Sequence, residues 1–312
     1  MTTNAGKPAL SLGPVYFLWD GPKWRDFYFR IADEAAVEHV TLGETVCSKR
    51  QHFSEPHIAE VVERLEAAGK RVTLSSLAMV TLPRESRHVR DLIADSIHPI
   101  EANDLSALGL LKGRPHAIGP LVNVYNAATA RLLAARGAQN ICLPPELPAA
   151  SIHPMLAAMP DFSFEIFAFG RMPLAISARC AHARSKGLTK DNCQFVCGEE
   201  PDSLPLRTLD RQSFLVLNGV QTMSNSCVVL VDDLAPLVEA GLSRIRLSPQ
   251  DCDMVEVAGL YRALLNGRID GEEAIAGLAR VYPGVRFSNG FLYRQEGAAW
   301  VSRGRNAATG RD

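Results

Sequence analysis

Residues 39–77 read HVTLGETVCSKRQHFSEPHIAEVVERLEAAGKRVTLSSL, and they predict a strand, a helix and a second strand in turn. The β-branched runs at 39–43 and 71–77 predict the two strands. Between them, an amphipathic helix is expected from about residue 56 to residue 69. It carries its apolar residues on one face: Ile58, Val61, Val62 and Leu65. Strand, helix and strand joined by short connections are typical of a parallel sheet with helical crossovers.

The same alternation continues on both sides of this unit. Further strands are expected at 14–19, 100–102, 117–122, 140–143, 162–169, 213–217 and 244–247, and further helices at 23–33, 126–136 and 233–240. About eight such units in about 250 residues favour a TIM-barrel-like (β/α) core over an open doubly wound sheet. No glycine fingerprint of the G-x-G-x-x-G or Walker type follows any of these strands, which weakens the dinucleotide-binding and P-loop alternatives.

Three cysteines form the most informative cluster in the chain. Cys180, Cys193 and Cys197 follow the pattern C-x12-C-x3-C within a polar stretch that offers little apolar surface to bury. Thiolates gathered on such a loop suit a soft metal centre. Cys47 is the best candidate for a fourth ligand, because it directly follows the expected strand at 39–43. In a barrel, the loops after the strands meet at one face, so this set predicts a cysteine-bearing loop over the C-terminal face of the strands.

Four thiolates suit either a [4Fe–4S] cluster or a tetrahedral zinc ion. Structural zinc usually takes its ligands from two close C-x2-4-C pairs, and this chain has one wide gap, one short gap and one distant partner. The spacing therefore favours the cluster, with zinc and a set of unrelated reduced thiols as alternatives. On this basis we expect a flexible N-terminus at 1–11, one barrel-like iron–sulfur domain at 12–301 and a disordered tail at 302–312.

Composition and charge limit the partners and the cellular compartment that are expected for this protein. Lys and Arg number 33 and Asp and Glu 34, for a net charge of −1, and no basic tract suggests a nucleic-acid partner. The seven cysteines are an odd number and no secretory signal precedes them, which favours a reducing compartment. No apolar run reaches the roughly 18 residues of a membrane-spanning helix. We therefore expect a cytoplasmic protein with no transmembrane segment.

Four stretches resemble a known family in the same order along the chain. They are LGETVCSKR at 42–50, PLAISARCAHAR at 173–184, VLNGVQTMS at 216–224 and RLSPQ at 246–250. Together they are similar to the UbiU/UbiV branch of the collagenase-like peptidase family. The resemblance runs from about residue 12 to residue 265, and the segment after Arg268 has no recognisable counterpart.

The resemblance implies a barrel-like core and a [4Fe–4S] cluster held by Cys47, Cys180, Cys193 and Cys197. It further implies a heterodimer with a UbiU-like partner, acting in oxygen-independent hydroxylation of the prenylated phenol precursor of ubiquinone, with prephenate as the oxygen donor. The chain would then be one subunit of a hydroxylase rather than an active peptidase. The alternative within the family is hydroxylation of tRNA, against which the net charge of −1 and the lack of a basic stripe stand.

Other polar residues are weaker site candidates, and the sequence identifies no catalytic base. Glu165 interrupts an apolar strand, so it is either an inward carboxylate or a group facing solvent or a partner. Arg179 and Arg184 flank the cysteine loop and are candidates to balance cluster charge, with surface solvation as the alternative. His182 is expected to be a solvated loop histidine. A further set either lines a pocket or serves in turns and helix caps: Asn123, Tyr125 and Asn126.

The remaining cysteines, Cys142, Cys227 and Cys252, are expected to be spare reduced thiols. For the partner interface, the apolar segment 77–82 and Met223 are candidates, with burial in the core as the alternative.

Overall fold

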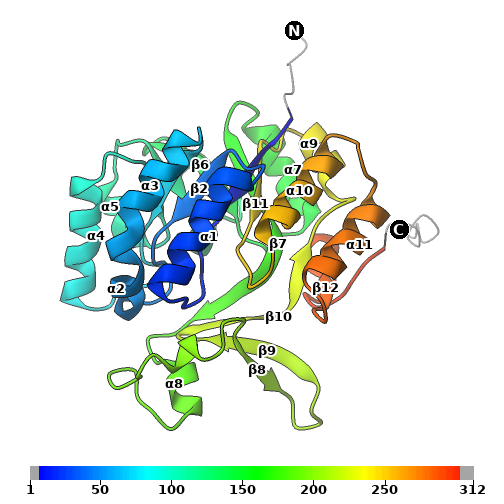
Figure 1. The fold of residues 1–312 in the computed structure, drawn as a ribbon. Helices are drawn as coiled ribbons and strands as arrows, with labels where there is room; N and C mark the ends of the chain where they lie inside the picture. The colour runs from blue at the N-terminus through cyan, green and yellow to red at the C-terminus, as the bar shows by residue number, and fades with distance from the viewer. Residues whose placement is uncertain (1–6, 303–312) are drawn as a thin grey trace.

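A closed barrel of eight parallel strands forms the body of the computed structural model, which describes residues 7–302 (Figure 1). The barrel strands are β1 (Ala9–Leu12), β2 (His39–Leu42), β3 (Arg71–Ser75), β4 (Ile100–Ala102), β5 (His116–Ile118), β6 (Ala138–Leu143), β7 (Ser163–Ile176) and β11 (Arg244–Leu247). Strand β11 closes the ring because it pairs in parallel with both β1 and β7. The expected TIM-barrel-like α/β fold is therefore confirmed.

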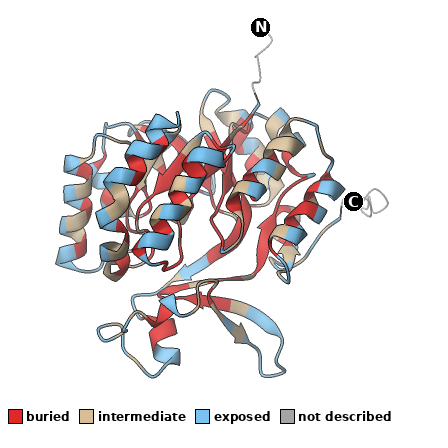
Figure 2. Cartoon of the chain, viewed as in Figure 1, coloured by how far each residue is buried: buried red, intermediate tan, exposed pale blue. Residues whose placement is uncertain are grey.

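Helices between the strands cover the outside of the barrel, and Figure 2 shows their inward sides buried and their outward sides exposed. The longer helices are α1 (Gly21–Glu34), α3 (Ile58–Ala67), α4 (Pro83–Asp95), α5 (Leu105–Leu110), α6 (Ala127–Ala134), α7 (Ala149–Ala158), α9 (Leu234–Glu239), α10 (Met254–Leu265) and α11 (Gly271–Val281). Short helical turns are η1 (Ser48–Arg50), α2 (Gln51–Ser54), η2 (Glu55–His57), η3 (Pro120–Val122), α8 (Ala181–Ser185), η4 (Val196–Gly198) and η5 (Gly290–Tyr293). Within the described residues, no helix has the length and apolar character needed to cross a membrane.

The first strand lies earlier in the chain than predicted. Residues 9–12 form β1, and the apolar run 14–19, expected to be a strand, is a buried connection that leads into α1. Both runs are apolar, so propensity does not separate them; residues 9–12 are the ones that find partners on both sides, in β2 and β11. Asp20 then caps α1 by accepting a hydrogen bond from the Lys23 N–H at 2.8 Å.

Two of the expected domain limits lie near the ends of the described residues. Strand β1 includes residues 9–11 of the segment expected to be flexible. The expected tail at 302–312 lies, apart from Ser302, outside the described residues.

Strand β7 extends far beyond the barrel, where it becomes the root of an antiparallel arm (Figure 1). Its first half pairs with β6 and β11 inside the barrel, and its second half pairs with β10 (Gln221–Val229). Strands β9 (Ser213–Asn218) and β8 (Leu204–Arg207) continue the arm, and β12 (Phe287–Ser288) joins β10. The strand expected at 213–217 therefore belongs to the arm and not to the barrel.

Gly170 marks the point where β7 leaves the barrel. Its φ is +127°, and an added Cβ would lie 2.8 Å from the Ser248 Cβ, so a side chain is excluded on two grounds. The arm hangs over the C-terminal ends of the barrel strands and carries the loop between β7 and β8, in which three of the four predicted ligands lie.

Candidate metal centre

The turn after β2 presents Cys47. Gly43 has a φ of +118°, and the Glu44 carboxylate then accepts hydrogen bonds from the backbone N–H groups of Val46 at 2.7 Å and Cys47 at 2.9 Å. Cys47 stands at the start of η1 with extended backbone. The carboxylate thus fixes the turn that positions the thiol.

The loop between β7 and β8 presents the other three thiols. Cys180 caps α8, and its Sγ accepts a hydrogen bond from the Ala183 N–H at 3.3 Å. Gln194 and Phe195 both have left-handed backbone, with φ of 49° and 56°, which reverses the chain between Cys193 and Cys197. The Val196 N–H donates to the Cys193 carbonyl at 3.2 Å and closes this reversal. Two successive strained residues at a tight turn are typical of a functional loop.

All four predicted thiols line one small cavity of about 20 Å³. Its remaining lining residues are Lys49, Arg50, Lys190, Phe195, Val196 and Gly219. Cys180 and Cys197 are nearly buried and the other two are half-buried, and all four are free thiols. Residues from the β2 end and from the arm, more than 130 positions apart in the chain, are therefore brought to one place.

The arrangement can be tested against the group that the sequence suggested. Among residues 7–302, no three His, Cys, Asp or Glu side chains stand close enough to hold a single metal ion. Zinc draws thiolates to about 2.3 Å from one centre, whereas the thiolates of a cluster bind different irons and so stand further apart. Four thiols lining one cavity are a donor set that fits a [4Fe–4S] cluster and equally a tetrahedral zinc ion.

Burial raises the pKa of two of the four thiols. It raises the pKa of Cys47, an effect that the nearby Arg50 guanidinium partly offsets. Burial likewise raises the pKa of Cys180, opposed by the hydrogen bond from Ala183. These two side chains are therefore neutral thiols at neutral pH, and binding of a metal centre would release their protons.

Arg50 is the polar residue of this site that sequence reasoning missed. It is 2% exposed, and its Nη1 and Nη2 donate to the Tyr16 carbonyl and the Asn218 Oδ1, each at 2.9 Å. Burial alone would lower the pKa of Arg50, but Cys197, Glu44 and Cys47 raise it above its usual value. Its Nε has no hydrogen-bond partner, and no carboxylate of the described residues forms an ion pair with it.

The position of Arg50 depends on a glycine in the arm. Gly219 has a φ of +64°, and an added Cβ there would lie 2.4 Å from the Arg50 Nη2. The sequence signal was available, because Arg50 closes the stretch LGETVCSKR and Gly219 lies inside VLNGVQTMS, two of the quoted motifs. What the sequence could not show is that the two motifs touch.

Of the three other basic candidates near the cysteine loop, His182 lies differently from what was expected. Arg179 and Arg184 are exposed, so the surface alternative holds for both. His182 is fully buried, and the expectation of a solvated loop histidine is wrong. The Gly219 N–H donates to its Nδ1 at 3.4 Å, so its Nε2–H faces the Glu200 carboxylate at 2.9 Å. His182 thereby ties α8 to the turn between β9 and β10.

Glu165 points into the barrel and is paired. Its carboxylate accepts hydrogen bonds from Arg246 Nη2 at 2.9 Å, from Asn140 Nδ2 at 3.0 Å and from the Ser11 hydroxyl. Arg246 also forms an ion pair with Glu101. Burial would raise the pKa of Glu165, but Arg246 and these hydrogen bonds lower it to about 2. Of the two alternatives, the inward position is therefore the observed one, and Glu165 is part of a buried ionic core.

The candidates after β5 serve mainly in local structure. Asn126 caps α6 by accepting from the Thr129 N–H at 2.9 Å, and Asn123 has left-handed backbone with a φ of 62°. Tyr125 donates its hydroxyl to Glu146 at 2.5 Å. Asn123 and Tyr125 also line a shallow hollow of about 630 Å³ at the barrel mouth.

Cys142, Cys227 and Cys252 do not line the cysteine cavity. The first two are fully buried, and Cys252 is half-buried.

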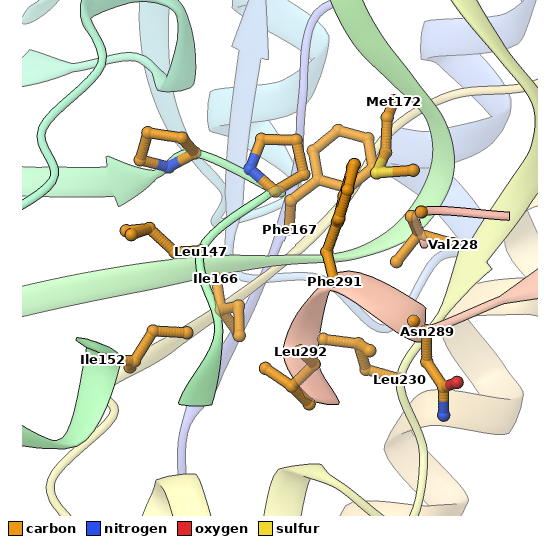
Figure 3. A pocket seen from close by; sticks show the side chains of 14 residues that line it. Leu147, Ile152, Ile166, Phe167, Met172, Val228, Leu230, Asn289, Phe291 and Leu292 are labelled. Carbon is orange, nitrogen blue, oxygen red and sulfur yellow. The ribbon is translucent and has the colours of Figure 1, made fainter. Parts of the chain in front are cut away.

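An apolar cavity of about 330 Å³ lies where the C-terminal segment covers the barrel (Figure 3). Its walls include Leu147, Ile166 and Phe167 of the barrel and Phe291 and Leu292 of η5. The polar side chain in this lining, Asn289, donates to the Val301 carbonyl at 3.0 Å. This cavity is a packing gap without reactive groups, and it shows that the segment after Arg268 is an integral part of the fold.

Comparisons with solved structures give only distant likenesses. An enzyme described as a fructose-1,6-biphosphate aldolase from Coccidioides immitis is 11% identical with a TM-score of 0.38, covering 89% of this chain and 95% of its own. The monotopic membrane protein (S)-mandelate dehydrogenase is 14% identical with a TM-score of 0.32, covering 88% and 74%. A mutant tryptophan synthase alpha-subunit from Pyrococcus furiosus is 11% identical with a TM-score of 0.30, covering 88% and 97%. At these values the likenesses say nothing about function.

A family model gives a clearer result, because it matches residues 26–302 and so includes the barrel from α1 onward, the arm, all four cysteines and the C-terminal segment. The chain belongs to peptidase family U32.

Proposed function

We propose that this chain is a UbiV-like protein, which holds a [4Fe–4S] cluster on Cys47, Cys180, Cys193 and Cys197. In this proposal it works with a UbiU-like partner in oxygen-independent hydroxylation of the prenylated phenol precursor of ubiquinone, with prephenate as the oxygen donor. Membership of family U32 and the four quoted motifs support it.

The observation that carries the proposal is a buried positive charge beside four thiols. A guanidinium taken out of water costs several kcal/mol unless an anion balances it, and Arg50 has no carboxylate in an ion pair. Four thiolates outweigh the positive charge of an oxidised cluster core, so a cluster in this cavity is an anion. The cavity thus has both the donors that such a group needs and a buried cation that its negative charge would stabilise.

Each residue has a definite task in this proposal. The cluster, when bound, would supply one-electron redox chemistry. The four cysteines would hold it, and Glu44 would keep the Cys47 turn in place through its two backbone hydrogen bonds. Arg50 would balance its charge while remaining anchored to Tyr16 and Asn218. The arm would limit the access of water and oxidants from one side.

Peptidase chemistry gains no support from the barrel mouth. The Ser75 hydroxyl bonds to Thr45 Oγ1 at 2.6 Å and accepts from Asn103 Nδ2 at 3.0 Å, and the Ser76 hydroxyl accepts from the Asn103 N–H at 3.0 Å. Neither serine has a histidine as a hydrogen-bond partner, so no base activates it as a nucleophile.

The first test is metal analysis of protein purified without air. We expect iron and acid-labile sulfide, and their content should fall when any one of Cys47, Cys180, Cys193 or Cys197 is replaced by alanine. Cys252→Ala is the matched control, because Cys252 is a half-buried thiol outside the cavity. Stoichiometric zinc without sulfide would overturn the cluster.

The second test is deletion of the gene, with quinone and tRNA nucleoside profiles compared under anoxia. We expect loss of ubiquinone with accumulation of an unhydroxylated precursor, rescued by the wild-type gene and not by Cys47→Ala. Loss of a modified tRNA nucleoside with normal ubiquinone would overturn the proposed substrate and favour the tRNA alternative. Co-expression with the UbiU-like partner should give a one-to-one complex.

A further inference from the structure

A long groove runs between α3 and α4 on the outside of the barrel, where β2 and β3 form its floor. It is open to solvent and much larger than the cysteine cavity. Its apolar lining consists of Leu42, Ile58, Ala59, Val62, Leu74 and Leu92. One end is bounded by Gly43 and Glu44, the residues that position the Cys47 turn.

The rim of this groove is strongly acidic. Carboxylates line it on both helices and at its ends, and no Lys or Arg does: Glu44, Glu55, Glu63, Glu66, Asp91 and Asp95. The basic residues in the lining are two histidines, of which His98 contacts Glu66 at 3.0 Å and His88 lies 3.7 Å from Glu55. An apolar floor between two acidic edges, of which Glu63, Asp91 and Asp95 make no ion pair with any described residue, is an unusual surface for a protein to leave uncovered.

We propose that this groove receives an amphipathic helix of a partner protein, with an apolar stripe facing the floor and Lys or Arg along both edges. The apolar floor alone would also suit the tail of a prenylated lipid. The acidic edges favour the helix, because a neutral hydrocarbon leaves them unpaired whereas a cationic helix pairs with them on both sides.

The dimensions agree with a short helix. The walls are the ten residues of α3 and the thirteen of α4, which corresponds to about 15–20 Å or three to four turns of an occupant. The docked helix would end beside the Cys47 turn, so a partner held here would stand next to the cysteine cavity. Docking itself needs no cluster, and its failure would leave the proposed cluster untouched.

The neighbouring candidates for an interface are less suitable. Leu77, in the segment 77–82, is buried and Leu82 is the exposed large apolar residue of that segment, while Met223 is fully buried. Met223 therefore belongs to the core and is not available to a partner.

The test uses the full chain and two synthetic peptides of about four turns. One is an amphipathic Lys/Leu helix, and the other has every Lys replaced by Glu with the leucines unchanged. We expect fluorescence anisotropy to detect binding of the Lys peptide only, weakened by added salt. The double variant Glu63→Lys/Asp91→Lys should weaken binding at least tenfold, since both side chains are exposed on the groove edges.

A matched double variant, Asp161→Lys/Glu239→Lys, makes the same change in net charge at exposed sites outside the groove and should change binding less than twofold. Ala59→Trp fills the groove from an exposed position on α3 and should abolish binding while the circular dichroism spectrum stays unchanged. Equal binding of the Lys and Glu peptides, or equal losses in the two double variants, would overturn the proposal. A prenylated phenol that binds, is lost in Ala59→Trp and is indifferent to Glu63→Lys/Asp91→Lys would overturn it in favour of a lipid-tail site.

Discussion

Arg50 and Arg246 are both about 2% exposed, yet they differ in what balances their charge. Arg246, inside the barrel, forms ion pairs with Glu101 and with Glu165. Arg50, between the barrel mouth and the arm, donates to a backbone carbonyl and an amide oxygen, and its Nε has no hydrogen-bond partner. The first site has carboxylates in contact with its cation, whereas the Glu44 carboxylate acts on Arg50 without forming a contact ion pair.

This difference separates a structural site from a binding site. A buried ion pair with further hydrogen bonds can hold a fold together without any outside group. A buried cation with no anion in contact lowers the free energy of unfolding. Proteins retain such unfavourable features mainly where function needs them. We therefore expect the cysteine cavity, and not the more charged centre of the barrel, to be the binding site.

Replacing Arg246 should give the largest effect, because Arg246→Leu would leave two buried carboxylates without a cation. Removal of one partner from a buried pair costs about 3–5 kcal/mol. We expect a fall of that size in the free energy of unfolding, measured by urea titration of the metal-free protein. Arg207→Leu on the exposed face of β8 is the control. A loss below about 1 kcal/mol would show that the ionic core does not stabilise the barrel.

Acid should weaken the same core in a defined range of pH. The pKa of Glu165 is lowered from 4.5 to about 2, so its contribution is fully present above pH 4.5 and is lost as the pH falls through about 2. The shift corresponds to at most about 3 kcal/mol. Glu165→Gln should flatten the dependence of unfolding free energy on pH in that range. Arg50→Met should leave the contribution of Glu165 unchanged, because the cations that lower the pKa of Glu165 are Arg246 and Arg244.

Replacing Arg50 should have effects of opposite sign in the metal-free and metal-loaded proteins. In the metal-free protein, Arg50→Met removes a buried charge that has no carboxylate in contact, and the Tyr16 carbonyl keeps its hydrogen bond from Asn218 Nδ2 at 2.7 Å. We therefore expect the unfolding free energy to change by less than about 1 kcal/mol, or to rise. In the loaded protein, loss of the cation should speed release of iron and lower the reduction potential.

A fall of about 60 mV would correspond to a loss of about 1.4 kcal/mol of interaction with the reduced centre. Arg50→Lys keeps the charge and should retain most of the potential. Strong destabilisation of the metal-free Arg50→Met protein, with no change in potential, would mean that Arg50 is a packing residue and nothing more.

The alternation of strands and helices was enough to predict the barrel, because each βα unit has its own local periodicity. The errors fell where pairing partners, and not propensity, determine structure. Residues 9–12 and 14–19 are both apolar, and only the former meet β2 and β11. Strand β7 is predicted locally, but its continuation into the arm depends on β10, some 50 residues later in the chain.

At the site, too, local features could be predicted from the sequence and long-range contacts could not. The cysteines could be chosen from residue type and spacing, since thiols on a polar loop are rare without a purpose. Arg50 could not be chosen, because its burial arises from the contact of η1 with Tyr16 and with Asn218, 168 residues away. The burial of His182 was missed for the same reason: it lies in a stretch of small and polar residues, and its contact with the turn at Gly219 cannot be read from that stretch.

Arg179 and Arg184 provide the smallest and most discriminating test of the comparison between the two arginine sites. They lie closer in sequence to the cysteines than most basic residues, and both are exposed, so water already screens their charge. Arg179→Ala and Arg184→Ala should each change the unfolding free energy by less than about 0.5 kcal/mol. Iron content and reduction potential should stay at wild-type values, in contrast to Arg50→Met. The opposite result would be a shift in reduction potential, on replacement of either exposed arginine, as large as the shift that Arg50→Met causes. That result would show that proximity along the chain, and not burial, determines which charges affect the potential.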